Sequence, residues 1–87
     1  MLVVDEIILS ESERAQRELP MRRGKYYIVY DAMCNLSRGM GPLDHPRPRA
    51  KGKSHLRDAP AWTRSREDMQ LFRCVREAAA EIKRIGA

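Results

Sequence analysis

Apolar positions in residues 1–19 follow the spacing of an amphipathic helix. The residues that share one side of such a helix are Val3, Val4, Ile7, Ile8, Ala15 and Leu19. A strand over residues 2–9 is the alternative, because β-branched side chains are frequent there. Ser10 and Glu13 would then form the capping box of a separate helix. The pattern favours one helix, which Pro20 ends in either case.

Residues 25–38 repeat the helical pattern. One face would carry the side chains of Tyr26, Val29, Tyr30, Met33 and Leu36. Asp31, Asn35 and Arg38 fall on the opposite face, and the glycine at position 39 suits a C-terminal cap. A strand over residues 25–31, with Asp31 capping a short helix after it, is the alternative because this stretch is aromatic and β-branched. We expect one helix over residues 25–38.

Residues 65–87 carry the clearest helical pattern in the chain. The apolar side of this helix would consist of Leu71, Phe72, Cys74, Val75, Ala78, Ala79, Ile82 and Ile85. Ser65 with Asp68 resembles a capping box at its start, and Gly86 suits its end. The small side chains of Ala78 and Ala79 would let a second helix approach closely. We therefore expect that this C-terminal helix is able to form a homodimer, from which a small domain gains most.

Prolines interrupt the pattern between the second and third predicted helices. Those that exclude a helix there are Pro42, Pro46, Pro48 and Pro60. Residues 41–62 are therefore expected to form a long extended loop, with Trp62 anchoring its end to the core. The predicted fold class is mainly α, a single small domain of residues 1–87 in which this basic loop joins the second and third of three helices. The alternative is an α+β fold with strands near residues 2–9 and 25–31.

Composition narrows the class of protein. Hydrophobic residues make up 43% of the chain and charged residues 33%, which fits a soluble globular domain. No apolar run approaches the roughly 18 residues of a membrane span, and the opening residues lack the pattern of a secretory leader. We expect a cytoplasmic protein without a membrane partner, in which Cys34 and Cys74 are buried free thiols.

The net charge of +5 is concentrated in the middle of the chain. Residues 1–19 hold five acidic and two basic side chains, a balance of −3. Residues 20–66 hold eleven basic and three acidic side chains, a balance of +8, and residues 67–87 hold four of each. A positive middle on a nearly neutral frame indicates an anionic partner, of which nucleic acid is the commonest.

Basic and titratable residues alternate with small, apolar or helix-breaking residues over residues 45–57, and we call this segment the basic arm. Its basic or titratable positions are His45, Arg47, Arg49, Lys51, Lys53, His55 and Arg57. In an extended chain a period of two places them all on one side, about 6.5 Å apart. That pitch is close to the spacing of phosphates on an extended nucleic-acid strand, so the arm is predicted to lie along a phosphate backbone.

The centre of the basic arm resembles the AT-hook, a short peptide that binds the minor groove of DNA. The resemblance covers residues 47–53, read as Arg-Pro-Arg-Ala-Lys-Gly-Lys. It departs from the hook at Pro48, where the hook has a glycine between two arginines. Proline adds bulk where the backbone of the hook approaches the groove floor. Contacts to phosphates need no such motif.

The predicted function is a small, non-enzymatic nucleic-acid-binding protein, with DNA and RNA both open. The predicted contacts are Arg22, Arg23, Lys25, Arg47, Arg49, Lys51, Lys53, His55 and Arg57. The alternative is a small regulator or inhibitor that binds an acidic protein surface through the arm, or a partner through the C-terminal helix.

Catalytic and metal chemistry is not expected. No constellation of acid, base and nucleophile stands out, and the chain has no phosphate-binding loop or dinucleotide fingerprint. The residues of a conceivable zinc site are Cys34, His45, His55 and Cys74. Their spacings match no close-paired ligand pattern, so we predict neither a metal nor a cofactor.

Overall fold

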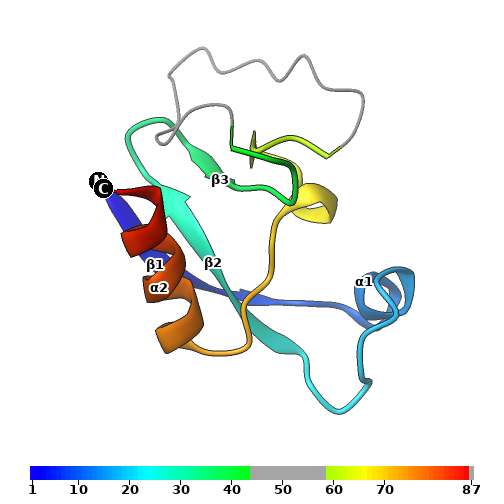
Figure 1. Ribbon diagram of the computed structural model, residues 1–87. Coiled ribbons are helices and arrows are strands. Elements are labelled where there is room, and N and C mark those ends of the chain that lie inside the picture. The colour runs from blue at the N-terminus through cyan, green and yellow to red at the C-terminus, as the bar shows by residue number, and fades with distance from the viewer. Residues whose placement is uncertain (44–58, 87) are drawn as a thin grey trace.

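The computed structural model describes residues 1–43 and 59–86. Its strands are β1 (Leu2–Ile8), β2 (Lys25–Asp31), β3 (Leu36–Arg38) and β4 (Trp62–Thr63). Its helices are α1 (Glu11–Gln16), the short 3-10 helix η1 (Arg66–Asp68) and α2 (Val75–Ile85). The strands form one antiparallel sheet in the order β1-β2-β3-β4 (Figure 1). Within the described ranges, no helix is long and apolar enough to cross a membrane.

The predicted three-helix fold is therefore wrong, and strands occupy the two segments for which a strand was the alternative. The reason is visible in β1, where apolar side chains change face part-way along the strand. Leu2 and Val4 pack with the core on the α2 side, whereas Ile7 packs with a second core. The step from Val4 to Ile7 is three residues, so a strand that is buried first on one face and then on the other imitates helical spacing.

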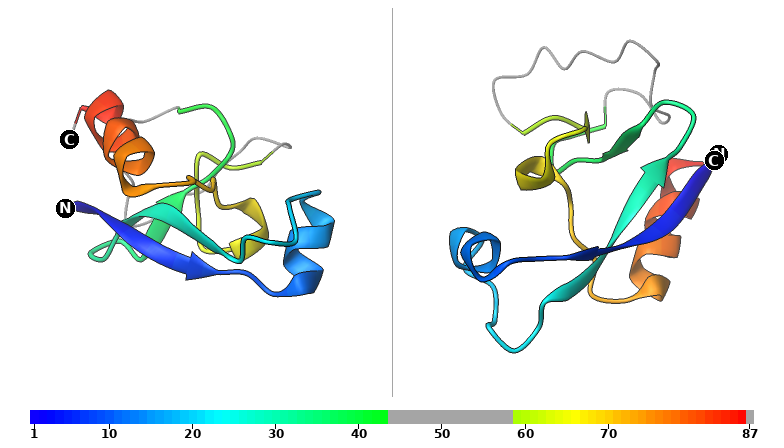
Figure 2. Two further views of the ribbon diagram at one scale, coloured as in Figure 1. Left: turned by 90° about the horizontal axis from the view of Figure 1, so that it is seen from below. Right: turned by 180° about the vertical axis from the view of Figure 1, so that it is seen from behind.

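Two hydrophobic clusters hold the sheet. The first joins β1, β2 and α2, and its buried members are Leu2, Val29, Phe72, Ala78 and Ile85. The second consists of Ile7, Leu9, Tyr26, Ile28 and Met69. Figure 2 shows α2 beside one end of the β1–β2 pair and α1 at the other end. Since the apolar side of α2 packs against its own sheet, the predicted homodimer would need a different face of this helix.

A tight turn replaces the second half of the predicted helix over residues 25–38. The Asp31 carboxylate accepts hydrogen bonds from the backbone N–H groups of Met33 (2.9 Å) and Cys34 (3.4 Å). Asn35 takes a left-handed conformation with φ of 53°, which reverses the chain into β3. Gly39 does not cap a helix. Its N–H bonds to the carbonyl of Ala61 at 2.7 Å, and a side chain there would collide with the carbonyl of residue 60.

The C-terminal helix begins later than predicted. Ser65 precedes only the short η1 and makes no side-chain cap, so the predicted capping box there is wrong. The chain then runs extended, and Phe72 exchanges two backbone hydrogen bonds with Tyr27 of β2, at 2.8 and 2.9 Å. Helix α2 starts only after Cys74, and its predicted end at Gly86 is confirmed by a left-handed φ of 83°. Trp62 pairs with β3 and packs on the first cluster, as expected for an anchor of the loop.

The capping box at the start of α1 is confirmed. The Ser10 hydroxyl accepts a hydrogen bond from the N–H of Glu13 (3.1 Å), and the Glu13 carboxylate accepts one from the N–H of Ser10 (2.9 Å). We expect Ser10→Ala to lower the free energy of unfolding by about 1 kcal/mol, because the first turn loses a partner for its N–H. Urea denaturation checks this value. Ser12→Ala, an exposed serine of the same helix, is the control and should change the free energy little.

A buried ion pair connects the sheet to α2. Arg38 of β3 donates from Nε to Glu81 Oε2 at 2.8 Å, and both side chains are less than a tenth exposed. The Arg38 guanidinium also donates to the carbonyls of Gly39, Gly41 and Ala61. Hydrogen bonds from Arg84 and then from Arg38 lower the pKa of Glu81. The sequence pattern had placed Arg38 on a solvent-exposed helix face, and that placement is wrong.

Candidate nucleic-acid interface

The structure describes three of the predicted contact residues, Arg22, Arg23 and Lys25, and all three are exposed. The other predicted contacts lie outside the described residues, and they are Arg47, Arg49, Lys51, Lys53, His55 and Arg57. His45 lies outside them as well. The extended shape of the basic arm therefore stays a prediction.

The three described residues gather around one surface hollow of about 470 Å³. We call it the basic hollow, and it is lined by Arg22, Arg23, Gly24, Lys25, Tyr27, Arg73 and Cys74. One wall comes from the approach to β2 and the other from the residues before α2. The backbone pairing of Tyr27 with Phe72 brings these distant segments together. Basic side chains from two parts of the chain thus converge at one place.

The charged groups of the basic hollow differ in how they are paired. Lys25 Nζ lies 3.1 Å from a Glu6 carboxylate oxygen, and this hydrogen bond raises the pKa of Lys25. Arg73 lies 3.7 Å from Glu77 one turn later. The guanidinium of Arg23 lies over the ring of Tyr26, with its carbon 5.7 Å from the ring centre. Within residues 1–43 and 59–86, neither Arg22 nor Arg23 has a carboxylate partner.

Arg73 is the residue of this site that the sequence did not predict. The helical pattern placed it on the polar side of a helix over residues 65–87, where it would have been one solvated charge among several. Its position in the hollow depends on the pairing of Phe72 with Tyr27. No local signal in the sequence indicates that pairing, because the two residues are far apart along the chain.

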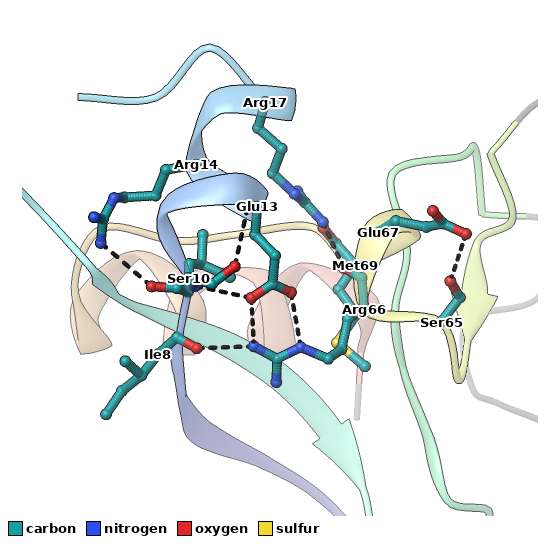
Figure 3. Close-up of polar contacts among 10 residues, drawn as sticks. Ile8, Ser10, Glu13, Arg14, Arg17, Ser65, Arg66, Glu67 and Met69 are labelled. Atoms are coloured by element: carbon teal, nitrogen blue, oxygen red, sulfur yellow. Dashed lines mark hydrogen bonds and ion pairs between the residues drawn. The ribbon is translucent and has the colours of Figure 1, made fainter. Parts of the chain in front are cut away.

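A larger hollow of about 780 Å³ lies between α1 and η1, and we call it the α1–η1 hollow. Its arginines are already engaged. Arg66 donates to both carboxylate oxygens of Glu13 (2.9 and 3.1 Å) and to the carbonyl of Ile8 at 2.8 Å (Figure 3). Arg17 donates to the carbonyls of Met69 (2.8 Å) and Arg66 (2.6 Å). These contacts fasten α1 to η1, so the α1–η1 hollow has less charge to offer an anion than the basic hollow.

The Glu13–Arg66 pair predicts an acid-sensitive part of the stability. The side-chain hydrogen bond from Arg66, followed by the backbone bond from Ser10, lowers the pKa of Glu13 to about 2. Because the folded pKa lies below the ordinary value of 4.5, the pair stabilises the fold above pH 4.5 and loses this effect as the pH falls towards 2. Glu13→Gln should therefore be less stable than the native chain at pH 7, and the difference should shrink towards pH 2.

Urea unfolding at pH 7, 4 and 2.5 measures this convergence. Glu11→Gln is the matched control, since it removes an exposed carboxylate from the same helix with no ion-pair partner among the described residues. A Glu13→Gln difference that stays constant across these pH values would contradict the assignment.

The described residues hold no group of three or more His, Cys, Asp or Glu side chains able to bind a metal ion. Cys34 and Cys74 form no disulfide, and the prediction that both are buried is wrong. Cys34 is half-buried, and Cys74 is exposed in the wall of the basic hollow. The two histidines of the conceivable zinc set, His45 and His55, lie outside the described residues.

Comparison of the chain with protein-family models, curated proteins and solved structures finds no match.

Proposed function

We propose that this protein binds nucleic acid through phosphate contacts made by the basic hollow and the basic arm. The observation that carries the proposal is the convergence of Arg22, Arg23, Lys25 and Arg73 on one hollow. Two of these four, Arg22 and Arg23, have no carboxylate partner among the described residues. Arginine presents a planar fork of N–H donors that suits phosphate oxygens. Guanidinium groups without a carboxylate partner are therefore able to donate hydrogen bonds to a phosphate.

Sequence preference is expected to be weak. Phosphate contacts fix the position and orientation of a nucleic acid but do not distinguish its bases. We also propose a cytoplasmic location, because Cys34 and Cys74 are not joined in a disulfide.

Fluorescence anisotropy with labelled duplex DNA and single-stranded RNA, at about 50 and 200 mM salt, tests this function. We expect binding at the lower salt that weakens steeply at the higher salt, with heparin as an effective competitor. No binding of either nucleic acid at the lower salt would contradict the proposal. Binding of one protein partner with good shape fit and little salt dependence would instead support the regulator alternative.

A further inference from the structure

We propose that the basic hollow binds a phosphate monoester dianion, such as the phosphate at the end of a nucleic-acid strand. This inference rests on the proposed function and names the part of the nucleic acid that the hollow takes. It concerns the hollow alone, whereas the basic arm would contact phosphates along the strand.

The charge of the hollow is the first argument. Four cations line it, and carboxylates of Glu6 and Glu77 lie beside two of them, Lys25 and Arg73, so four positive and two negative charges leave +2. A phosphodiester within a strand carries a single negative charge. A phosphate monoester carries about −1.5 to −2 at pH 7, so it matches the hollow more closely.

The donors of the hollow are the second argument. A monoester offers three terminal oxygens as acceptors, one more than the two non-bridging oxygens of a diester. Arg22 and Arg23 have no described carboxylate partner, so their guanidinium forks are free to donate to these oxygens. Arg73 lines the hollow from the segment before α2. Its guanidinium lies 3.7 Å from the Glu77 carboxylate, which is a long distance for an ion pair, so an incoming phosphate would be a stronger acceptor for it.

The shape of the hollow is the third argument. A hollow of about 470 Å³ is within the range of small-ligand sites, about 300–1,000 Å³, and is far smaller than a segment of duplex. A strand end enters such a concave site more readily than the middle of a helix does. Tyr27 lines the same hollow and is only partly buried against the first cluster, so we expect the base next to the terminal phosphate to stack on it.

The test compares four single strands of identical sequence, of about 12 nucleotides, in anisotropy titrations at pH 7.5. One carries a 5′-phosphate, one a 3′-phosphate, one both, and one neither. We expect a terminally phosphorylated strand to bind about tenfold or more tightly than the strand without phosphate, the effect of an additional charge-assisted hydrogen bond. The preference should shrink at pH 5.5, because the second pKa of a phosphate monoester is about 6.

Two variants locate the preference. Arg23→Ala/Arg73→Ala removes cations from both walls of the hollow, and the preference for the phosphorylated strand should disappear. Arg76→Ala/Lys83→Ala is the matched control: it removes two exposed charges of α2 that lie outside the hollow and have no ion-pair partner among the described residues. The control should keep the preference. All four substituted side chains are exposed, and circular dichroism confirms that each variant folds.

The outcomes separate the inference from the proposed function. Equal binding of all four strands overturns the inference and leaves nucleic-acid binding standing. No binding of any strand overturns the proposed function. A preference that survives in the Arg23→Ala/Arg73→Ala variant also overturns the inference. Competition by adenosine 5′-monophosphate at the level of the phosphorylated strand supports the monoester site and assigns it to a free nucleotide instead of a strand end.

Discussion

Glu81→Ala is expected to lower the free energy of unfolding by about 3 to 5 kcal/mol, because it leaves the Arg38 guanidinium buried without a carboxylate. Arg38 and Glu81 have side chains only 6% and 8% exposed, and they meet at 2.8 Å. A stranded charge at this position keeps its hydrogen bonds to neighbouring carbonyls but loses the group that neutralises it. The whole fold is stabilised by only about 5 to 15 kcal/mol, so this loss is a large part of it.

The position of the Arg38–Glu81 pair explains why its loss should destabilise several elements of the fold. Arg38 holds β3 to the chain segments at Gly41 and Ala61, and Glu81 belongs to the only long helix of the described part. Arg84 also pairs with Glu81 at 2.7 Å, but its side chain is 58% exposed. Water can therefore solvate the Arg84 guanidinium once the Glu81 carboxylate is removed. The cost is therefore expected to come from Arg38 and not from Arg84.

Urea denaturation at pH 7 measures the change. Glu77→Ala is the matched control, because it removes a carboxylate of the same helix whose ion pair with Arg73 is exposed. The control should cost less than about 1 kcal/mol. Equal destabilisation by Glu81→Ala and Glu77→Ala would show that the buried pair has no special role.

The second large effect is expected on nucleic-acid binding. A variant with Arg47, Arg49, Lys51 and Lys53 all replaced by alanine should lose about 3.6 from the slope of log affinity against log salt on duplex DNA, at about 0.9 per phosphate contact. Over a fourfold rise in salt, a slope of that size corresponds to roughly a 150-fold loss of affinity. The native chain should show at least this steep a dependence, and the variant should lose the part that these four residues contribute.

The basic hollow should contribute separately from the arm. Alanine at Arg22, Arg23 and Arg73 together should lower the salt slope further, because it removes three of the four cations that line the hollow. The arm and hollow variants combined should remove more of the salt dependence than either variant alone. Arg76→Ala/Lys83→Ala serves again as the control of equal charge type. An unchanged affinity and slope in the arm variant would contradict the arm as a phosphate contact.

Two local features of the fold were found in the sequence, the start of α1 and the end of α2, whereas the features that depend on distant contacts were missed. The capping box of Ser10 and Glu13, which belonged to the strand alternative, marks the start of α1, and Gly86 marks the end of α2. Both caps depend only on residues within one turn. Strand β1 was mistaken for a helix because its buried face changes part-way along the strand, and β2 because buried side chains lie on both of its faces. Strand alternation then breaks at the change of face between Val4 and Ile7.

The same division holds for the charged residues. Arg22, Arg23 and Lys25 were identified from charge alone, and the structure places them together. Arg73 joins them only through the pairing of distant segments. Arg38 carried no sign of burial, since its carboxylate partner and its carbonyl partner at Ala61 both lie far along the chain.

Amide chemical-shift mapping by NMR tests the central claim most directly. Isotope-labelled protein would be titrated at about 50 mM salt with a 12-nucleotide strand that carries a 5′-phosphate. The account predicts that the amide chemical shifts of residues 22–25 and 73–74 change most during the titration, while those of α1 change little. The absence of shifts, or shifts centred on the α1–η1 hollow, would contradict it.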